Sequence, residues 1–215
     1  MLVLGDAHAD DPAHRRALLA AYETADADVA LQTGDLLTYE LPTPTWFVAG
    51  NNEAFDVIER LRSGDAGGTG NANLLASTAV ELDGLRVAGL SGNYAPTQYE
   101  KSRSELAGDR RRHFVRDDVE RLYRLDDVDV LLAHEAPHGV LETDGYDVGC
   151  RPLDDLLRSL APDLCLVGHH HEHTEGTFGS TRVVTLAPAW ESYYLLDSER
   201  LTLTRRETPS DQSVD

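Results

Sequence analysis

Short apolar runs alternate with helical patterns along this chain of 215 residues, and this alternation limits the fold more than any other feature. Five of the runs have the composition of strands that are buried on both faces, as in the parallel sheets of α/β proteins. They are Leu2–Leu4, Val29–Leu31, Trp46–Ala49, Val128–Ala133 and Leu164–Val167. The pattern therefore predicts an α/β protein built from stacked layers of sheet and helix.

The remaining elements fill the spaces between these runs. Strands at Ala79–Leu82 and Arg86–Leu90 flank Asp83-Gly84 and predict a hairpin. Three later strands are expected to close the chain as an antiparallel set: Val183–Leu186, Tyr193–Leu196 and Leu201–Thr204. Helices are predicted at Ala13–Thr24, Ala54–Arg62, Asp117–Leu125 and Pro152–Leu160, and a glycine-rich loop at Asp65–Asn73. We expect one domain over residues 1–206 and a disordered polar tail over 207–215.

The charge of the chain indicates the ionic strength at which the protein works and the kinds of partner that it can bind. The formal net charge is −19, and Lys101 is the only lysine. Such a surface repels itself at low ionic strength and is screened in concentrated salt, which is typical of a protein from a halophilic archaeon. An acidic proteome from a GC-rich genome is the alternative. The same charge argues against nucleic-acid binding by the whole surface.

Cysteine content and hydropathy indicate the compartment. The only cysteines are Cys150 and Cys165, and Cys165 lies in an apolar run, so neither a structural disulfide nor a thiolate metal site is expected. No apolar run approaches the roughly 20 residues that a membrane helix needs. The first residues read as a strand and not as a secretory signal. A cytoplasmic protein without membrane contact is predicted.

Polar side chains follow each of the five buried strands. These clusters are Asp6-Ala7-His8, Gly34-Asp35, Gly50-Asn51-Asn52-Glu53, His134 and Gly168-His169-His170-His171. If the strands are parallel, all five clusters emerge at the same carboxyl edge, where open α/β folds bind their ligands.

The clusters have the chemistry of a metal site. Asp6 and His8 are two residues apart, so an extended exit from the strand points both side chains to one side. His169 and His171 share this relation, and His170 faces away. Ligands of oxygen and nitrogen without thiolate suit Mn²⁺, Fe or Zn²⁺. Two such ions ~3.5–4 Å apart would hold a hydroxide between them and clamp the oxygens of an in-line phosphoryl displacement.

Each cluster taken alone also has a purely structural interpretation. Asp-x-His can be a helix cap, Gly-Asp a turn, and the histidine of Ala-His-Glu-Ala-Pro a loop cap. Three consecutive histidines at a strand end have few structural uses. The order of the clusters, and their places at strand ends, favour metal binding.

Together the five clusters resemble the five motifs of the calcineurin-like metallophosphoesterases. The resemblance spans Asp6 to His171 and implies a two-sheet β-sandwich flanked by helices, in four layers of αββα order. It implies two divalent metal ions, Mn first, with Fe, Zn or Ni as alternatives. One ion would be held by Asp6, His8, Asp35 and His171. The other would be held by Asp35, Asn51, His134 and His169.

Asn52 departs from the pattern of that family. Many members have histidine there, which stabilises the transition state or protonates the leaving oxygen, and some small phosphodiesterases of bacteria and archaea have cysteine. Asn52 can donate a hydrogen bond but cannot deliver a proton at neutral pH. This difference favours diesters, or a proton from another source: His138, His113 or a metal-bound water. His170 is a further candidate for assisting the reaction.

A basic segment precedes the third predicted helix. Residues 91–116 carry six basic and three acidic side chains, a local charge of +3. Arginines and aromatic rings near a metal site can hold phosphates and bases, whereas a solvated loop with Arg–Asp pairs is the alternative. The predicted substrate contacts are Asn52, Tyr94, Arg110, Arg111, Arg112 and His113.

This segment adds a second resemblance. Arg86 to Tyr94, then Tyr99, and His134-Glu135-Ala136-Pro137 are similar to the corresponding parts of RNA lariat debranching enzymes. Those enzymes usually have cysteine at the place of Asp6 and histidine at the place of Asn52. The similarity implies a nucleotide or RNA phosphodiester as substrate.

The sequence thus predicts a metal-dependent phosphoester hydrolase, with phosphodiesters favoured. A phosphomonoesterase on the same site is one alternative, and a non-catalytic partner-binding module of the same fold is another. A homodimer formed through the apolar strands near residues 193–204 is a further possibility.

Overall fold

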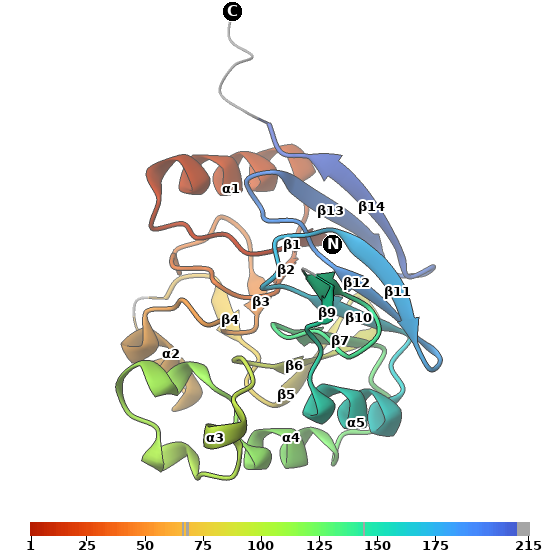
Figure 1. Cartoon of the computed structure of the whole chain (residues 1–215). Coiled ribbons are helices and arrows are strands. Elements are labelled where there is room, and N and C mark those ends of the chain that lie inside the picture. Colours follow the sequence, from red (N-terminus) through yellow and green to blue (C-terminus); the bar gives the residue numbers. More distant parts are fainter. Residues whose placement is uncertain (66, 68, 144, 210–215) are drawn as a thin grey trace, which may run out of the picture.

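Two six-stranded sheets stack face to face, with helices on their outer sides, in this computed structural model (Figure 1). The structure describes residues 1–209 except 66, 68 and 144. The arrangement confirms the predicted α/β sandwich with four layers. Among the described residues, no helix combines the length and the apolar character needed to cross a membrane.

The first sheet has the strand order β14-β13-β1-β2-β3-β4. Its three central strands β1, β2 and β3 run parallel to one another, and β13 pairs antiparallel with β1. The strands are β1 (Leu2–Leu4), β2 (Ala30–Gln32), β3 (Thr45–Phe47), β4 (Ala72–Leu74), β13 (Ser192–Asp197) and β14 (Thr202–Glu207). This sheet is therefore assembled from segments that lie far apart in the sequence.

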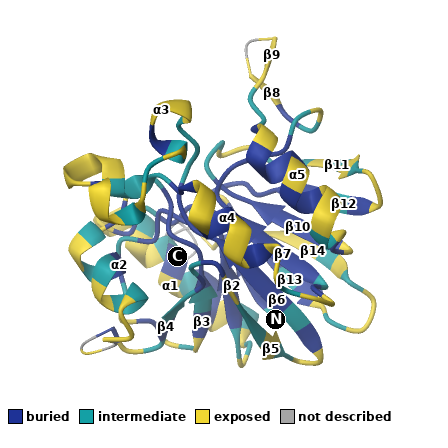
Figure 2. Ribbon diagram, turned by 90° about the horizontal axis from the view of Figure 1, so that it is seen from below, coloured by how far each residue is buried: buried dark blue, intermediate teal, exposed yellow. Residues whose placement is uncertain are grey.

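The second sheet comes from the middle of the chain and has the order β11-β12-β10-β7-β6-β5. Strands β6, β7, β10 and β12 are parallel, and β5 and β11 pair antiparallel at the two edges. The strands are β5 (Thr78–Leu82), β6 (Leu85–Leu90), β7 (Val130–Ala133), β10 (Leu164–Val167), β11 (Thr174–Phe178) and β12 (Thr181–Thr185). A separate small hairpin, β8 (Glu142–Thr143) and β9 (Tyr146–Asp147), projects from the molecule (Figure 2).

The helices cover the outer faces of the two sheets. Helix α1 (Pro12–Ala25) begins at Asp11, whose Oδ1 accepts hydrogen bonds from the amides of Ala13 and His14. With α2 (Phe55–Arg62) it packs on the first sheet, whereas α4 (Arg116–Leu122) and α5 (Arg151–Leu160) pack on the second. The basic segment forms α3 (Pro96–Tyr99) and the 3₁₀ helices η1 (Arg103–Glu105) and η2 (Gly108–Arg112).

Apolar side chains on both faces of the central strands explain the continuous apolar runs. Leu2 and Leu4 belong to the cluster beneath α1, whereas Val3 points between the sheets. In β7, Val130 and Leu132 likewise fill the space between the sheets. Because successive side chains of a strand alternate in direction, a strand inside a sandwich is apolar at every position. Figure 2 shows these strands as the buried centre of the molecule.

Three details differ from the prediction. The antiparallel set predicted to close the chain does not exist as one unit, because β12 lies in the second sheet and is parallel to β10. The glycine-rich loop contains β4, which pairs with β3 through the backbone. The predicted tail began at Glu207, but this residue ends β14 and Thr208 is buried; residues 210–215 lie outside the described part.

Candidate metal centre

The five polar clusters all leave their strands at the same end. Asp6, Asp35 and Asn51 follow β1, β2 and β3 of the first sheet, whereas His134 and His169 follow β7 and β10 of the second. Parallel pairing within each sheet places the carboxyl ends of these strands together. The site therefore lies across the boundary between the two sheets and takes residues from both.

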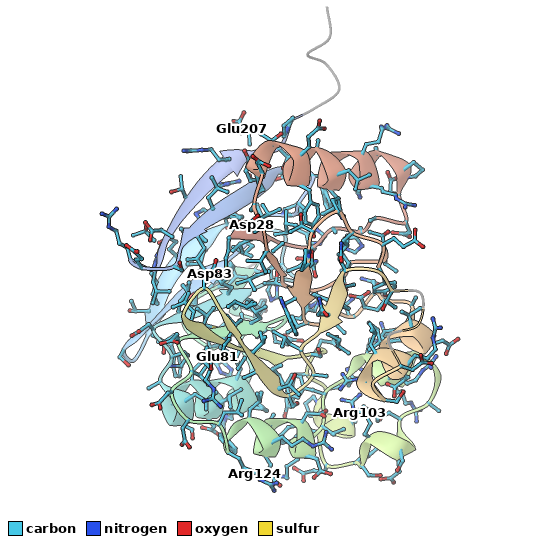
Figure 3. The ribbon with its side chains drawn as sticks, turned by 180° about the vertical axis from the view of Figure 1, so that it is seen from behind. Asp28, Glu81, Asp83, Arg103, Arg124 and Glu207 are labelled. Atoms are coloured by element: carbon cyan, nitrogen blue, oxygen red, sulfur yellow. The ribbon has the colours of Figure 1, made fainter. Side chains whose placement is uncertain are left out.

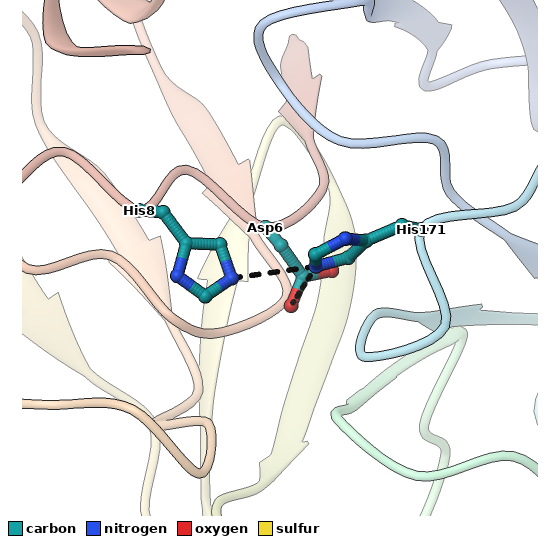
Figure 4. Close-up of side chains that lie close together, drawn as sticks. All are labelled: Asp6, His8 and His171. Atoms are coloured by element: carbon teal, nitrogen blue, oxygen red, sulfur yellow. Dashed lines mark hydrogen bonds and ion pairs between the residues drawn. The ribbon is translucent and has the colours of Figure 1, made fainter. Parts of the chain in front are cut away.

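One group of three potential ligands consists of Asp6, His8 and His171 (Figure 4). The Nε2 atoms of His8 and His171 lie 3.3 Å apart, and Nε2 of His171 is 4.0 Å from Oδ1 of Asp6. Oδ2 of Asp35 lies 3.4 Å from Nε2 of His8. These are the four residues that the family resemblance assigns to one ion.

A second group consists of Asp6, Asp35 and His134, all of them buried. Nε2 of His134 is 3.6 Å from Oδ1 of Asp35 and 2.9 Å from Oδ1 of Asn51. The rings of His134 and His169 lie 4.8 Å apart. The structure thus brings the four residues predicted for the other ion together, with Asp35 between the two groups.

The protons in this second group fit a bound cation. Nδ1 of His134 lies 2.8 Å from the carbonyl oxygen of Thr33, which can only accept, so the ring proton is on Nδ1. Because burial lowers the pKa of His134, the ring is neutral and its Nε2 carries a lone pair. That lone pair faces carbonyl and carboxylate oxygens, which also lack protons. A cation removes the repulsion between them.

The buried carboxylates lead to the same conclusion. Among the described residues, Oδ1 of Asp6 has no hydrogen-bond partner, although it is fully buried; Oδ2 accepts a hydrogen bond from the amide of His169. Burial, and secondly the charge of Asp35, raises the pKa of Asp6 well above its usual range. Two adjacent carboxylates in a buried site are unfavourable without a compensating positive charge. The donor set therefore fits divalent metal ions.

The outer histidines are held neutral, as metal ligands must be. Burial, with a contribution from His134, lowers the pKa of His169 to about 4. Burial also lowers the pKa of His171, and His8 adds to this effect. At neutral pH these imidazoles offer lone pairs and carry no charge that would repel a cation.

Strained backbone conformations are concentrated at the predicted ligands. His8, Asp35, His169 and His171 have φ values of 42°, 53°, 73° and 55°. Residues other than glycine rarely adopt this left-handed region, and where they do the strain often marks a functional site. These conformations turn the chain after β1, β2 and β10, where side chains from different strands meet.

Two glycines leave room for this convergence. A Cβ atom on Gly34, which has φ +119°, would lie 2.2 Å from Nδ1 of His134. A Cβ atom on Gly50 would lie 2.1 Å from Oδ1 of Asp35. Any larger residue would therefore push Asp35 or His134 out of the site.

Glu53 ties the second and third loops together. Its Oε1 accepts hydrogen bonds from the amides of Leu36 (3.0 Å) and Gly50 (3.4 Å). Its Oε2 accepts from the amide of Leu37 (3.4 Å) and from the hydroxyl of Tyr39 (2.6 Å). The residues next to Asp35 and Asn51 are thus fixed by one buried carboxylate, which holds the ligand loops in place.

Asn52 is exposed and bonds to Asp35 with both of its nitrogens. The backbone amide donates to Oδ1 of Asp35 at 2.7 Å, and the side-chain amide donates to Oδ2 at 2.8 Å. A pocket of about 420 Å³ beside it is lined by Asn51, Asn52 and Arg112, among others. Of the predicted substrate contacts, Asn52 and Arg112 therefore share one pocket.

The other predicted substrate contacts lie elsewhere. Arg111 forms an ion pair with Asp56 at 2.7 Å, and Arg110 is exposed. Tyr94 packs against Phe114 and lines a different pocket. His113 pairs with Asn93 through the backbone, and burial lowers the pKa of its ring.

The two other candidate catalytic histidines have different surroundings. Nδ1 of His138 is 2.8 Å from Oδ2 of Asp154 at the start of α5, so its ring is fixed by that carboxylate and not by a predicted metal ligand. The ring of His170 packs edge-on against His169, and burial lowers the pKa of His170 to about 4. His170 is therefore adjacent to the site and uncharged at neutral pH.

Trp190 is a neighbour of the site that the sequence did not indicate. Its ring stacks on His14 at a centroid distance of 3.9 Å and contacts His171 at 5.2 Å. Trp190 follows β12 by several residues, and a tryptophan in a loop carries no pattern that assigns it to a site. Thr33, which orients His134, was missed because the interaction uses its backbone carbonyl.

Comparisons with known proteins agree with the geometry. The sequence profile of the calcineurin-like phosphoesterase family matches residues 1–173. The lariat debranching enzyme of Schizosaccharomyces pombe is 28% identical over 167 residues, which are 64% of this chain and 36% of that enzyme. This chain therefore spans little more than a third of the length of that relative.

Solved structures share the fold along nearly the whole chain. The TT1561 protein of Thermus thermophilus aligns with a TM-score of 0.67 and 18% identity, over 97% of this chain and 98% of that one. A structure described as a novel archaeal phosphodiesterase aligns with a TM-score of 0.53 and 14% identity, over 96% and 99% of the two chains. At these identities the likeness shows the fold.

Proposed function

The chain belongs to the calcineurin-like phosphoesterase family, a family of metal-dependent phosphoester hydrolases, and we propose that it hydrolyses phosphodiesters with two divalent metal ions. The first ion would be held by Asp6, His8, Asp35 and His171. The second would be held by Asp35, Asn51, His134 and His169. Divalent ions in such a site supply an activated water and neutralise charge on the phosphoryl oxygens.

The pocket next to the metal centre carries the preference for diesters. It joins the Asn51–Asn52 loop to Arg112 of the basic segment and has a volume of about 420 Å³. A guanidinium group is well suited to a phosphate oxygen. Asn52 and His171 are exposed, so the site is open to a substrate that continues on both sides of the phosphorus atom.

Asn52 limits the leaving groups that the site can serve. Its amide can donate a hydrogen bond to a phosphoryl oxygen, but it has no proton to give to the departing oxygen. Esters whose leaving oxygen is stable without a proton should therefore react fastest. The names of two similar proteins, a lariat debranching enzyme and an archaeal phosphodiesterase, support the diester as substrate class.

A comparison of two chromogenic esters tests the proposal. Metal-stripped protein in concentrated KCl receives Mn²⁺ and is assayed with bis-p-nitrophenyl phosphate and with p-nitrophenyl phosphate. We expect Mn²⁺-dependent cleavage of the diester and little cleavage of the monoester. The reverse preference would identify a phosphomonoesterase. Inactivity on both esters, in folded protein that binds two metal ions, would instead favour a partner-binding module.

Variants of the basic segment test the role of the pocket. Arg112→Gln removes the guanidinium from the pocket and should raise KM for the diester several-fold, with kcat changed less, because the lost contact holds a phosphate oxygen before and during the reaction. Arg60→Gln, an exposed arginine of α2, is the matched control and should leave both constants unchanged. Equal kinetics for both variants would remove Arg112 from the substrate site.

A further inference from the structure

A basic pocket lies between α2 and α4, and none of its described lining residues belongs to the candidate metal centre. Its volume is about 290 Å³. The lining residues are Glu59, Arg62, Ser63, Ala76, Arg103 and Arg121. Three guanidinium groups, one each from α2, η1 and α4, therefore face one small space. Figure 3 shows Arg103 close to α2.

The acidic groups around the pocket do not balance these arginines. Arg103 is paired with the buried carboxylate of Asp118. Glu59 lies 3.8 Å from Nε of Arg62, which is too far for a hydrogen bond. Three arginines against Glu59 and Asp118 leave a charge of +1 in a chain whose net charge is −19. A positive excess is thus concentrated in one hollow of an acidic surface.

The terminal nitrogens of Arg103 donate to Asp118 and to the carbonyl oxygens of Arg111 and His113, but one donor on each of two guanidinium groups has no acceptor among the described residues. Within the described part of the chain, the buried Nε atoms of Arg62 and Arg103 have no hydrogen-bond partner. The side chain of Arg62 is 13% exposed. Burial, and secondly the charge of Arg103, lowers the pKa of Arg62 to about 10. A buried donor without an acceptor is costly, and a positive neighbour adds to the cost.

We propose that this pocket binds a tetrahedral oxyanion of the phosphate class, held by Arg62, Arg103 and Arg121. Guanidinium groups present fixed pairs of N–H donors that match the oxygens of phosphate or sulfate. An anion there offsets the repulsion between the guanidinium groups that line the pocket. The inference concerns a site apart from the metal centre and does not depend on the proposed function.

The bound anion would also join two elements that flank the metal centre. Helix α2 begins directly after the Asn51–Glu53 loop, and α4 follows the basic segment. Arg62 ends α2 and Arg121 lies in the last turn of α4. An oxyanion between them therefore fixes the basic segment relative to the loop that carries Asn51 and Asn52.

Nuclear magnetic resonance of the arginine side chains tests the proposal. The Nε–Hε signals of Arg62 and Arg103 are followed while potassium phosphate or sulfate replaces KCl at constant ionic strength. We expect both signals to shift and to saturate, because the anion binds against the guanidinium groups that carry these N–H bonds. No shift, or an equal shift when chloride alone is raised, would overturn the proposal.

Two single substitutions provide the matched comparison. Arg121→Gln removes a guanidinium from the rim of the pocket with little effect on packing, since Arg121 is exposed, and should weaken sulfate binding about tenfold. Arg124→Gln removes an exposed arginine just beyond the end of α4 (Figure 3) and should leave the titration unchanged. Equal affinities in both variants would contradict the assignment.

Two further titrations separate this site from the metal centre and identify the source of the phosphate. The Asp35→Asn substitution damages the candidate metal centre, so the Arg62 signal should still shift when phosphate or sulfate is added to this variant. Loss of the shift would refute the claim that the anion site is separate from the metal centre. A single-stranded oligonucleotide supplies phosphate as a backbone. If inorganic phosphate binds more tightly than the oligonucleotide, as measured on the Arg62 and Arg103 signals, the ligand is a free ion. If the oligonucleotide binds more tightly, the ligand is a backbone phosphate held by the same three arginines.

Discussion

At the scale of single residues, Asp35 connects the two halves of the candidate site. Its Oδ2 lies 3.4 Å from Nε2 of His8 and its Oδ1 lies 3.6 Å from Nε2 of His134. Both oxygens also accept hydrogen bonds from Asn52. A single carboxylate thus contacts both groups of candidate ligands and the side chain of Asn52.

Replacing Asp35 by asparagine should separate metal binding from folding. The amide removes a charge shared by the two proposed cation sites, so activity should fall at least about 100-fold, since even partners of ligands contribute 10–100-fold. The fold should persist, because loss of the charge relieves repulsion with Asp6. Mn²⁺ should raise the Tm of the parent protein and not that of the variant. Circular dichroism controls for folding, and an unchanged response to Mn²⁺ would contradict the assignment.

The histidine that the family resemblance places at position 52 can be introduced into this chain. Asn52→His supplies a proton donor next to Asp35, so we expect at least about tenfold faster cleavage of a diester with an alkyl leaving group. Bis-p-nitrophenyl phosphate is the control, because its leaving group needs no proton and its rate should change little. Unchanged turnover on the alkyl ester would show that leaving-group protonation does not limit this enzyme.

Sequence reasoning could predict which residues meet at the candidate metal centre because each of them lies just after a buried strand. Asp6 and His8, or His169 and His171, can be recognised from one short segment. The pairing of His138 with Asp154 and that of Arg111 with Asp56 join residues that no local pattern relates. Their positions depend on loop conformation and helix packing, which the order of residues does not reveal.

At the scale of elements, α5 shows how a helix holds the second sheet. Its leucines Leu153, Leu156 and Leu157 are buried against the face opposite the first sheet, in contact with a cluster that includes β7 and β10. Those two strands lead into His134 and His169. The packing of one amphipathic helix therefore stabilises the sheet that supplies part of the predicted ligand set.

Truncating one of these leucines should destabilise the protein without touching the site. Leu156 has no exposed surface, and Leu156→Ala should lower the free energy of unfolding by about 2–5 kcal/mol. Leu19→Ala removes a leucine that is 39% exposed and should have a much smaller effect. Urea denaturation of the metal-free proteins measures both. Similar losses would mean that the α5 interface is poorly packed.

The limits of the most apolar strands were predicted correctly, whereas the partner of one strand and the presence of another were not. The strongest strands, such as Leu2–Leu4 and Leu164–Val167, have the predicted limits because apolar runs end abruptly at polar clusters. The partner of β12 could not be predicted, since a short apolar run fits a parallel or an antiparallel neighbour equally well. Strand β4 was missed because Ala72–Leu74 follows several glycines and owes its conformation to pairing with β3.

At the scale of the whole molecule, charge is the dominant feature. The net charge of −19 is spread over a surface whose basic side chains are nearly all arginine. Repulsion among like charges acts through solvent and is weakened by salt, with a screening length of about 10 Å at 0.1 M and about 3 Å at 1 M. The folded state, which holds these charges closer together than the unfolded chain, is therefore favoured by salt.

Unfolding temperature should rise with KCl concentration. We expect Tm to increase between about 0.1 M and 1 M KCl, the range over which screening becomes effective. The double variant Asp126→Asn, Asp127→Asn removes two exposed charges and should reduce the dependence on salt. Differential scanning calorimetry provides the measurement. A Tm that does not depend on KCl would show that the acidic surface does not limit stability.

The pairing of β1 with β13 has a consequence for synthesis on the ribosome. Leu2 pairs with Leu195, so β1 is translated long before the strand that covers one of its edges. Domains generally fold as they emerge, but this sheet cannot be completed early. Asp6 and His8, which follow β1, are likewise translated long before the histidines that they meet in the fold: His134, His169 and His171. A nascent chain therefore cannot assemble the candidate metal centre until His171 has been translated, and one edge of β1 stays unpaired until β13 has followed.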